Sequence, residues 1–184
     1  MQDKTLYTIT IFSENTVGLL SQVTSVFTRR QLNIETLSVS ASAIEGIHKF
    51  TITVYCDEEM VKKVVLQIDK RVDVLKSYYN TNEELIHQEI ALYKLSTPEF
   101  LKIPSVEELI RKHNARILDI NENCVVLEKT GHYQETQDLF EELSQTIGVL
   151  QFIRSGRIAI TKSKIERLSD MLKELDRKYS VNNG

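Results

Sequence analysis

The order of the predicted secondary-structure elements is the feature that most constrains this fold. It runs strand, helix, strand, strand, helix, strand, and then begins again. Strands are predicted where β-branched residues alternate with polar ones, as in "LYTITIF", and helices where apolar residues recur every three or four positions. The first series ends near Tyr79, and the second series repeats its element order but not its residues.

Each series predicts one ferredoxin-like βαββαβ unit, in which two helices cover one face of a four-stranded antiparallel sheet. The fold class is therefore α+β with two such units. We expect a first unit at 1–80, a linker at 81–88, and a second unit at 89–184 that ends in an amphipathic helix over 164–179. The second face of each sheet is then uncovered, polar or available to a partner, and the many apolar strand residues favour a covered face and an oligomer.

Local signals mark where several elements begin. Asp57 can cap the helix that follows it, and the stretch from Ser105 to Glu108 fits a capping box. The only two prolines, Pro98 and Pro104, predict a loop before that second helix. The polar stretch 121–123 between two predicted strands predicts a hairpin turn.

Composition and charge exclude several classes of partner. The formal net charge of -3 argues against nucleic acid and anionic membranes, which favour basic surfaces. Cys56 and Cys124 form no C-x-x-C pattern and are expected to be buried thiols in a reducing compartment, not a disulfide. No apolar run approaches the roughly 18–20 residues of a membrane span. The start, "MQDKTLYTIT", does not resemble a secretory signal, so the expected location is the cytoplasm.

The sequence predicts neither a catalytic nor a metal site. Its histidines show no metal-binding spacing and are expected to be surface or strand-edge residues; they are His48, His87, His113 and His132. The patterns G-x-x-x-x-G-K-[ST], G-x-G-x-x-G and G-x-S-x-G are all absent. No set of residues for acid–base or nucleophilic chemistry is visible.

The loop before the first helix, within "SENTVGLL", is the best candidate for binding. Gly18 has no Cβ, so a ligand carboxylate can approach the N–H groups at the start of the helix. Asn15 offers a donor and an acceptor, which suits an amino acid. Asn33 opens the second strand, which we expect to lie close to this loop across the sheet. Alternatively, Asn15 caps a turn and Gly18 only admits the chain to the helix, and spacing alone favours this second interpretation.

A longer stretch, "SENTVGLLSQVTSVFTRRQLNIETLSV", resembles the first loop, helix and strand of the ACT domain of acetolactate synthase small subunits. That family shows E-N-x-x-G-x-L and then F-x-R-R-x-x-N-I-x-S/T-L. Three later stretches are similar to further motifs of the family, in the same order: "KRVDVLKS", "EIALYKL" and "FIRSGRIAITK". The resemblance covers both units and nearly the whole chain.

The resemblance implies a regulatory subunit without activity of its own. Such a subunit binds the catalytic (large) subunit of acetolactate synthase, raises its activity, and confers feedback inhibition by branched-chain amino acids, usually valine. The catalytic subunit would carry thiamine diphosphate, Mg²⁺ and FAD, and this chain no cofactor. The first unit would be an ACT domain that forms a homodimer, with the effector at the interface of the pair. Residue by residue, the resemblance maps the effector site to Asn15, Gly18, Leu19, Asn33 and Ile34.

Two positions depart from the family pattern. Many members have glycine where this chain has Gln31, and arginine where it has Gln22. A glycine at the first position would end the helix in a left-handed turn, so Gln31 must adopt that conformation or the helix ends differently. Two other functions stay open: a stand-alone ACT-type sensor that acts on another protein, and a small ferredoxin-like enzyme.

Overall fold

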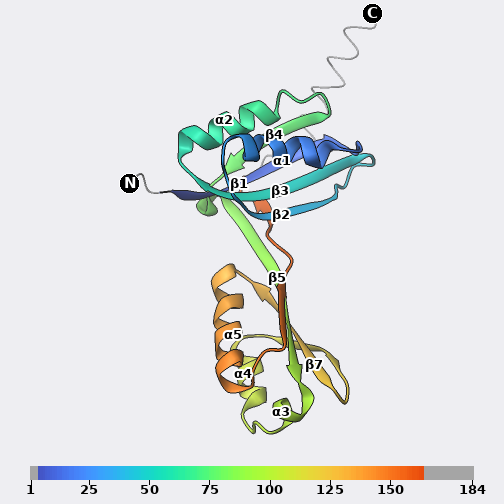
Figure 1. The fold of residues 1–184 in the computed structure, drawn as a ribbon, viewed down its shortest axis with the longest axis vertical. Coiled ribbons are helices and arrows are strands. Elements are labelled where there is room, and N and C mark those ends of the chain that lie inside the picture. The colour runs from blue at the N-terminus through green and yellow to red at the C-terminus, as the bar shows by residue number, and fades with distance from the viewer. Residues whose placement is uncertain (1–3, 164–184) are drawn as a thin grey trace, which may run out of the picture. The chain divides into compact units, whose positions relative to one another are not determined.

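The computed structural model of the chain describes residues 4–163, which divide into two compact units (Figure 1). Unit 1 comprises 4–86 and 160–163, and unit 2 comprises 87–159. In the stretch 81–88, expected as a linker or the lead-in to a strand, Asn82–Glu84 form a short 3₁₀ turn and the next strand begins at Leu85. The expected helix over 164–179 lies outside the described residues.

Unit 1 has the predicted βαββαβ order. Its elements are β1 (Thr5–Glu14), α1 (Leu19–Arg29), β2 (Ile34–Ala41), β3 (Ile47–Cys56), α2 (Glu58–Ile68) and β4 (Val74–Asn80). The strands lie in the order β2-β3-β1-β4, and every neighbouring pair is antiparallel. Both helices cover the same face of the sheet, as Figure 1 shows. The predicted ferredoxin-like fold is therefore confirmed for this unit.

The core of unit 1 follows from the alternation along its central strand. Ile9 and Ile11 are fully buried beneath the helices, together with Val23 of α1 and Val64 of α2. Burial of such a side chain contributes about 1.5–3 kcal/mol. The alternate positions Thr8 and Thr10 of β1 pair with threonines of β3 and are only 1% and 3% exposed, so this part of the second face is buried as well.

Unit 2 repeats the order with an additional short helix, α3, and a fifth strand, β9. Its elements are β5 (Leu85–Ser96), α3 (Thr97–Leu101), α4 (Val106–Lys112), β6 (Arg116–Ile120), β7 (Cys124–Gly131), α5 (Tyr133–Thr146), β8 (Gln151–Arg154) and β9 (Ile158–Thr161). The strand order is β6-β7-β5-β8, and β9 also pairs with β5. Tyr93 and Leu127 of the sheet pack with Leu139 of α5 in the core. Among the described residues of the chain, no helix is long and apolar enough to cross a membrane.

The structure tests the predicted start signals one by one. Asp57 caps α2, because its Oδ1 accepts a hydrogen bond from the Met60 N–H at 2.8 Å. Ser105 precedes α4 but makes no side-chain cap, so the predicted capping box is wrong.

The hairpin turn at 121–123 is confirmed, because the Asn121 side-chain oxygen accepts hydrogen bonds from the N–H groups of Asn123 and Cys124. Pro98 lies in the first turn of α3 and not in a loop, because that turn needs no proline N–H.

Candidate functional site

The loop between β1 and α1 has the shape that the sequence suggested. Gly18 has φ 87°, a left-handed conformation that favours glycine. A Cβ built on Gly18 would meet no atom within 4 Å, so the side of the loop toward which it would point is open space. Glycine is therefore favoured here by the backbone conformation and not by crowding.

The start of α1 presents unused hydrogen-bond donors. No side chain caps the helix, and its first turn contains no acidic residue. The N–H groups of Leu20 and Ser21 have no acceptor among residues 4–163. The positive end of the helix dipole and free N–H groups together favour an anion such as a carboxylate.

The loop residues named from the sequence differ in their availability to a ligand. Asn15 is exposed, and its backbone N–H donates to the Gly46 carbonyl at 3.0 Å, which fixes the loop against the turn between β2 and β3. Leu19 is buried in the core, with only 2% of the residue exposed. A ligand can therefore contact the Asn15 side chain but not that of Leu19.

Asn33 and Ile34 lie at the opposite end of the sheet from this loop. At one end, Glu14 of β1 pairs with Ile47 of β3; at the other end, Val54 of β3 pairs with Ile34. The expectation that Asn33 approaches the loop within one chain is therefore wrong. The reason is that β1 and β2 run parallel on either side of β3. The connection between them must therefore return along the length of the sheet, and α1 does so with 11 residues and a length of about 16 Å.

Ser13 is a site candidate that the sequence did not indicate. It is fully buried near the end of β1, two residues before Asn15, and its Oγ has no hydrogen-bond partner among the described residues. A buried hydroxyl without a partner costs about 1–3 kcal/mol. No local pattern distinguishes it from an ordinary strand serine, because its burial depends on the packing of β3 and β4 on either side.

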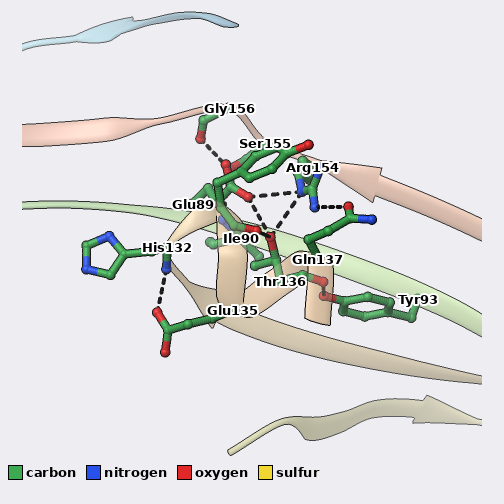
Figure 2. Close-up of polar contacts among 11 residues, drawn as sticks. Glu89, Ile90, Tyr93, His132, Glu135, Thr136, Gln137, Arg154, Ser155 and Gly156 are labelled. Atoms are coloured by element: carbon green, nitrogen blue, oxygen red, sulfur yellow. Dashed lines mark hydrogen bonds and ion pairs between the residues drawn. The ribbon is translucent and has the colours of Figure 1, made fainter. Parts of the chain in front are cut away.

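Unit 2 contains a buried polar network, drawn in Figure 2. The Arg154 Nε lies 3.0 Å from Glu89 Oε1, and the Thr136 hydroxyl donates to the same oxygen at 2.7 Å. The Tyr93 hydroxyl donates to the Thr136 carbonyl at 2.7 Å, and burial raises the pKa of this hydroxyl far above its usual range. The network joins β5, α5 and β8, and its groups satisfy one another, which is typical of a structural network.

The motif Arg154-Ser155-Gly156 forms the break between β8 and β9. The Ser155 Oγ accepts a hydrogen bond from the Ile90 N–H at 3.0 Å and donates to the Gly156 carbonyl at 2.8 Å. Gly156 has φ 78°, which explains the glycine. These three residues thus have a structural role that the sequence did not reveal.

The histidines are not all isolated. His87 and His132 lie 45 positions apart in sequence, and their Nδ1 atoms are 3.3 Å apart. The His113 Nε2 contacts Glu142 Oε2 at 2.7 Å. Residues 4–163 contain no group of three or more histidine, cysteine or acidic side chains placed to hold a metal ion.

Two family models match consecutive parts of the chain. Residues 9–76 match the model of the AHAS small subunit-like ACT domain, and residues 88–163 match the model of the small subunit of acetolactate synthase. The probable acetolactate synthase small subunit of Archaeoglobus fulgidus is 29% identical over 156 residues, which are 85% of this chain and 96% of that protein. The acetolactate synthase small subunit of Bacillus subtilis is 27% identical over 162 residues, 88% of this chain and 93% of the relative.

A solved structure agrees with both units of the fold. The crystal structure of the acetolactate synthase small subunit from Thermotoga maritima matches with a TM-score of 0.77 and 23% identity, covering 87% of this chain and 99% of that chain. One family model matches unit 1 and the other matches unit 2, in the order that the sequence motifs indicated. The chain belongs to the acetolactate synthase small-subunit family, and its first unit is an ACT domain.

Proposed function

We propose that this chain is the regulatory subunit of acetolactate synthase, that it raises the activity of the catalytic subunit, and that it confers feedback inhibition by a branched-chain amino acid, valine first. The observation that carries the proposal is the succession of the two family models along both units. Thiamine diphosphate, Mg²⁺ and FAD then belong to the catalytic subunit, and this chain contributes regulation in the cytoplasm.

The effector site in this proposal needs two copies of the chain. The loop around Gly18 and the strand start at Asn33 lie at opposite ends of one sheet, so a ligand that touches both must lie between copies. Pairing of two β2 edges about a two-fold axis brings the start of one β2 toward the end of the other. Exposed apolar side chains support this interface: Val17 is 100% exposed, and Leu20 and Val39 are 45% and 40% exposed.

The chemistry of the loop then recognises an amino acid by its three parts. The carboxylate accepts hydrogen bonds from the N–H groups at the start of α1, which have no other acceptor among the described residues. The side-chain amide oxygens of Asn15 and of Asn33 from the second copy can accept hydrogen bonds from the ammonium group. An apolar side chain buried at the interface adds about 1.5–3 kcal/mol, which favours valine, leucine or isoleucine over polar amino acids.

Regulation follows if the effector prefers one arrangement of the paired ACT domains. A coupling free energy of about 1–3 kcal/mol between effector and catalytic subunit changes the affinity or the active population by about 5–150-fold. Such a coupling is sufficient for feedback control and requires no catalytic group on this chain.

Reconstitution tests the proposal directly. The purified chain is added to the purified catalytic subunit, and acetolactate production is measured with and without valine, leucine or isoleucine. We expect a higher rate that becomes sensitive to valine. Unchanged rates in all conditions would overturn the proposal. Valine binding in calorimetry, combined with no effect on the catalytic subunit, would instead support the stand-alone sensor.

A further inference from the structure

The second face of the unit 1 sheet is buried along its two central strands. The helices α1 and α2 lie on the opposite face, against Ile9 and Ile11 (Figure 1). Side chains on an uncovered face of an antiparallel sheet usually remain in contact with water. Five residues of β1 and β3 on the second face are nevertheless only 1–8% exposed: Thr8, Thr10, Phe12, Thr51 and Thr53. A further layer of the chain must therefore cover this strip of the sheet.

The buried strip is about as wide as one helix. It spans two neighbouring strands, which lie about 4.8 Å apart, and an α-helix with its side chains is about 10–12 Å wide. On either side of the strip the face is open, because Ser40 of β2 and Lys76 of β4 are exposed. The ring of Phe12 contacts that of Tyr78, but Phe12 is itself buried, so these side chains are not the outermost layer. The footprint therefore fits a single helix better than a broad protein surface.

The part of the chain that the structure describes ends beside this strip. After β9, the Lys162 N–H donates to the Glu84 carbonyl at 2.9 Å. The Glu84 carboxylate accepts a hydrogen bond from the Asn80 side chain at 3.2 Å, and Asn80 pairs with Thr8 in the sheet. The segment that follows Ser163 therefore starts at the Thr8 end of the strip.

The sequence of that segment matches the strip in pattern and in length. Its apolar residues recur with the spacing of one helix face, at Ile165, Leu168, Leu172 and Leu175. This stripe would be about 15 Å long in a helix, and the strip from Thr8 to Phe12 is about 13 Å long. We propose that residues 164–179 form a helix whose apolar stripe packs across the central threonines of β1 and β3 and closes the second face of the ACT domain.

This cover removes the second face of the ACT domain from the surfaces that a partner can use. Burial also lowers the pKa of the Lys49 ammonium, which pairs with Phe12 across the sheet, as a layer over this face requires. The cover shares no residue with the proposed effector site at the Gly18 loop and the β2 edge. A failure of either proposal therefore leaves the other intact.

Thiol labelling of the full chain tests whether the face is covered. In a Cys124→Ser background, Thr51→Cys places a thiol inside the strip, and Ser40→Cys places a control thiol on the open part of the same face. We expect the thiol in the strip to react with a disulfide reagent at least tenfold more slowly, because a buried thiol reacts only when the structure opens locally. Thr10→Cys is a second reporter in the strip, and circular dichroism verifies that each variant is folded.

Two changes in the segment separate its apolar stripe from its opposite side. Leu168→Lys combined with Leu172→Lys should make the thiol in the strip react at least tenfold faster. Glu166→Gln combined with Glu174→Gln adds the same net charge on the opposite side and should leave the slow reaction unchanged. Fast labelling in the strip with the unmodified segment, or equally slow labelling in both double variants, would overturn the proposal. Slow labelling that becomes faster on dilution would also overturn it, since a second copy would then be the cover.

Discussion

Gln31 and Asn114 have the same left-handed backbone conformation at equivalent places in the two units, with φ 54° and 50°. Gln31 follows α1, and Asn114 follows α4. In both cases the next residue donates its N–H back into the last helical turn, at 3.0 and 2.9 Å respectively. Gln31 and Asn114 also donate their own N–H groups to the last turn, at 3.0 and 3.1 Å, and the two bonds at each helix end are those of a Schellman motif. The two units therefore share a helix ending as well as an order of elements.

Replacement of Gln31 by glycine should stabilise unit 1 by about 0.5–1 kcal/mol. A side chain in the left-handed region costs about 1–2 kcal/mol, and glycine removes this cost. The greater conformational freedom of glycine in the unfolded chain offsets part of the gain. Asn114→Gly is the matched control and should gain less, since asparagine tolerates this conformation. Denaturant unfolding of each variant measures the difference. A loss of stability in Gln31→Gly would contradict the assigned helix ending.

Removal of the Asp57 side chain should destabilise α2. Asp57→Ala loses the hydrogen bond with the Met60 N–H and should cost about 1 kcal/mol. Ser105→Ala is the matched control, because Ser105 occupies the cap position of α4 without making a cap bond, and should change little. Thermal unfolding of the two variants compares them. Equal losses of stability in Asp57→Ala and Ser105→Ala would show that the two cap positions are equivalent.

The buried ion pair of unit 2 should be costly to break on one side. Glu89→Gln leaves the Arg154 charge without its carboxylate, and breaking such a pair costs about 3–5 kcal/mol. The control is Glu58→Gln, which removes an exposed pair with Lys62 and should cost at most about 0.5 kcal/mol. Urea unfolding measures both changes. Similar small losses would mean that solvent reaches the Glu89 pair.

The two cysteines should differ in their reaction with thiol reagents. Burial, together with the charge of Asp57, raises the pKa of the Cys56 thiol to about 11, so Cys56 stays protonated and unreactive at pH 8. Cys124 is only half-buried. A disulfide reagent at pH 8 should therefore label one thiol in the folded chain and two after unfolding. In Cys124→Ser, rapid labelling should disappear; persistence of rapid labelling would show that Cys56 is accessible.

Local patterns were sufficient to predict the elements of unit 1 and most of those of unit 2, but not α3, where a loop was predicted. Period-two alternation located β1 and β3, and the three-to-four-residue spacing located α1 and α2. For Gln31 the sequence left two options open, a left-handed residue or a different helix ending, and the structure shows the left-handed residue. These predictions depend on neighbours within a few positions of the chain.

Features that depend on contacts between distant positions were not predicted from the sequence. The position of Asn33 depends on which end of the sheet α1 reaches, and the loop pattern contains no such information. The Glu89–Arg154 pair and the two facing histidines join positions far apart in the chain. The burial of Ser13 depends on two neighbouring strands. For the candidate site, the sequence therefore indicated the loop, and the structure showed that Asn33 lies at the other end of the sheet.

Substitution of Gly18 by Asp and by Asn separates charge from size in the proposed effector site. Both side chains tolerate the left-handed backbone, and the Cβ enters open space, so both variants should fold and still activate the catalytic subunit. If the effector carboxylate binds at the start of α1, Gly18→Asp should abolish the valine response by like-charge repulsion, and Gly18→Asn should only weaken it. Valine titration of acetolactate production measures this order. Full valine sensitivity in Gly18→Asp would place the effector elsewhere. A negative charge next to those N–H groups must lower the affinity for a carboxylate that binds them.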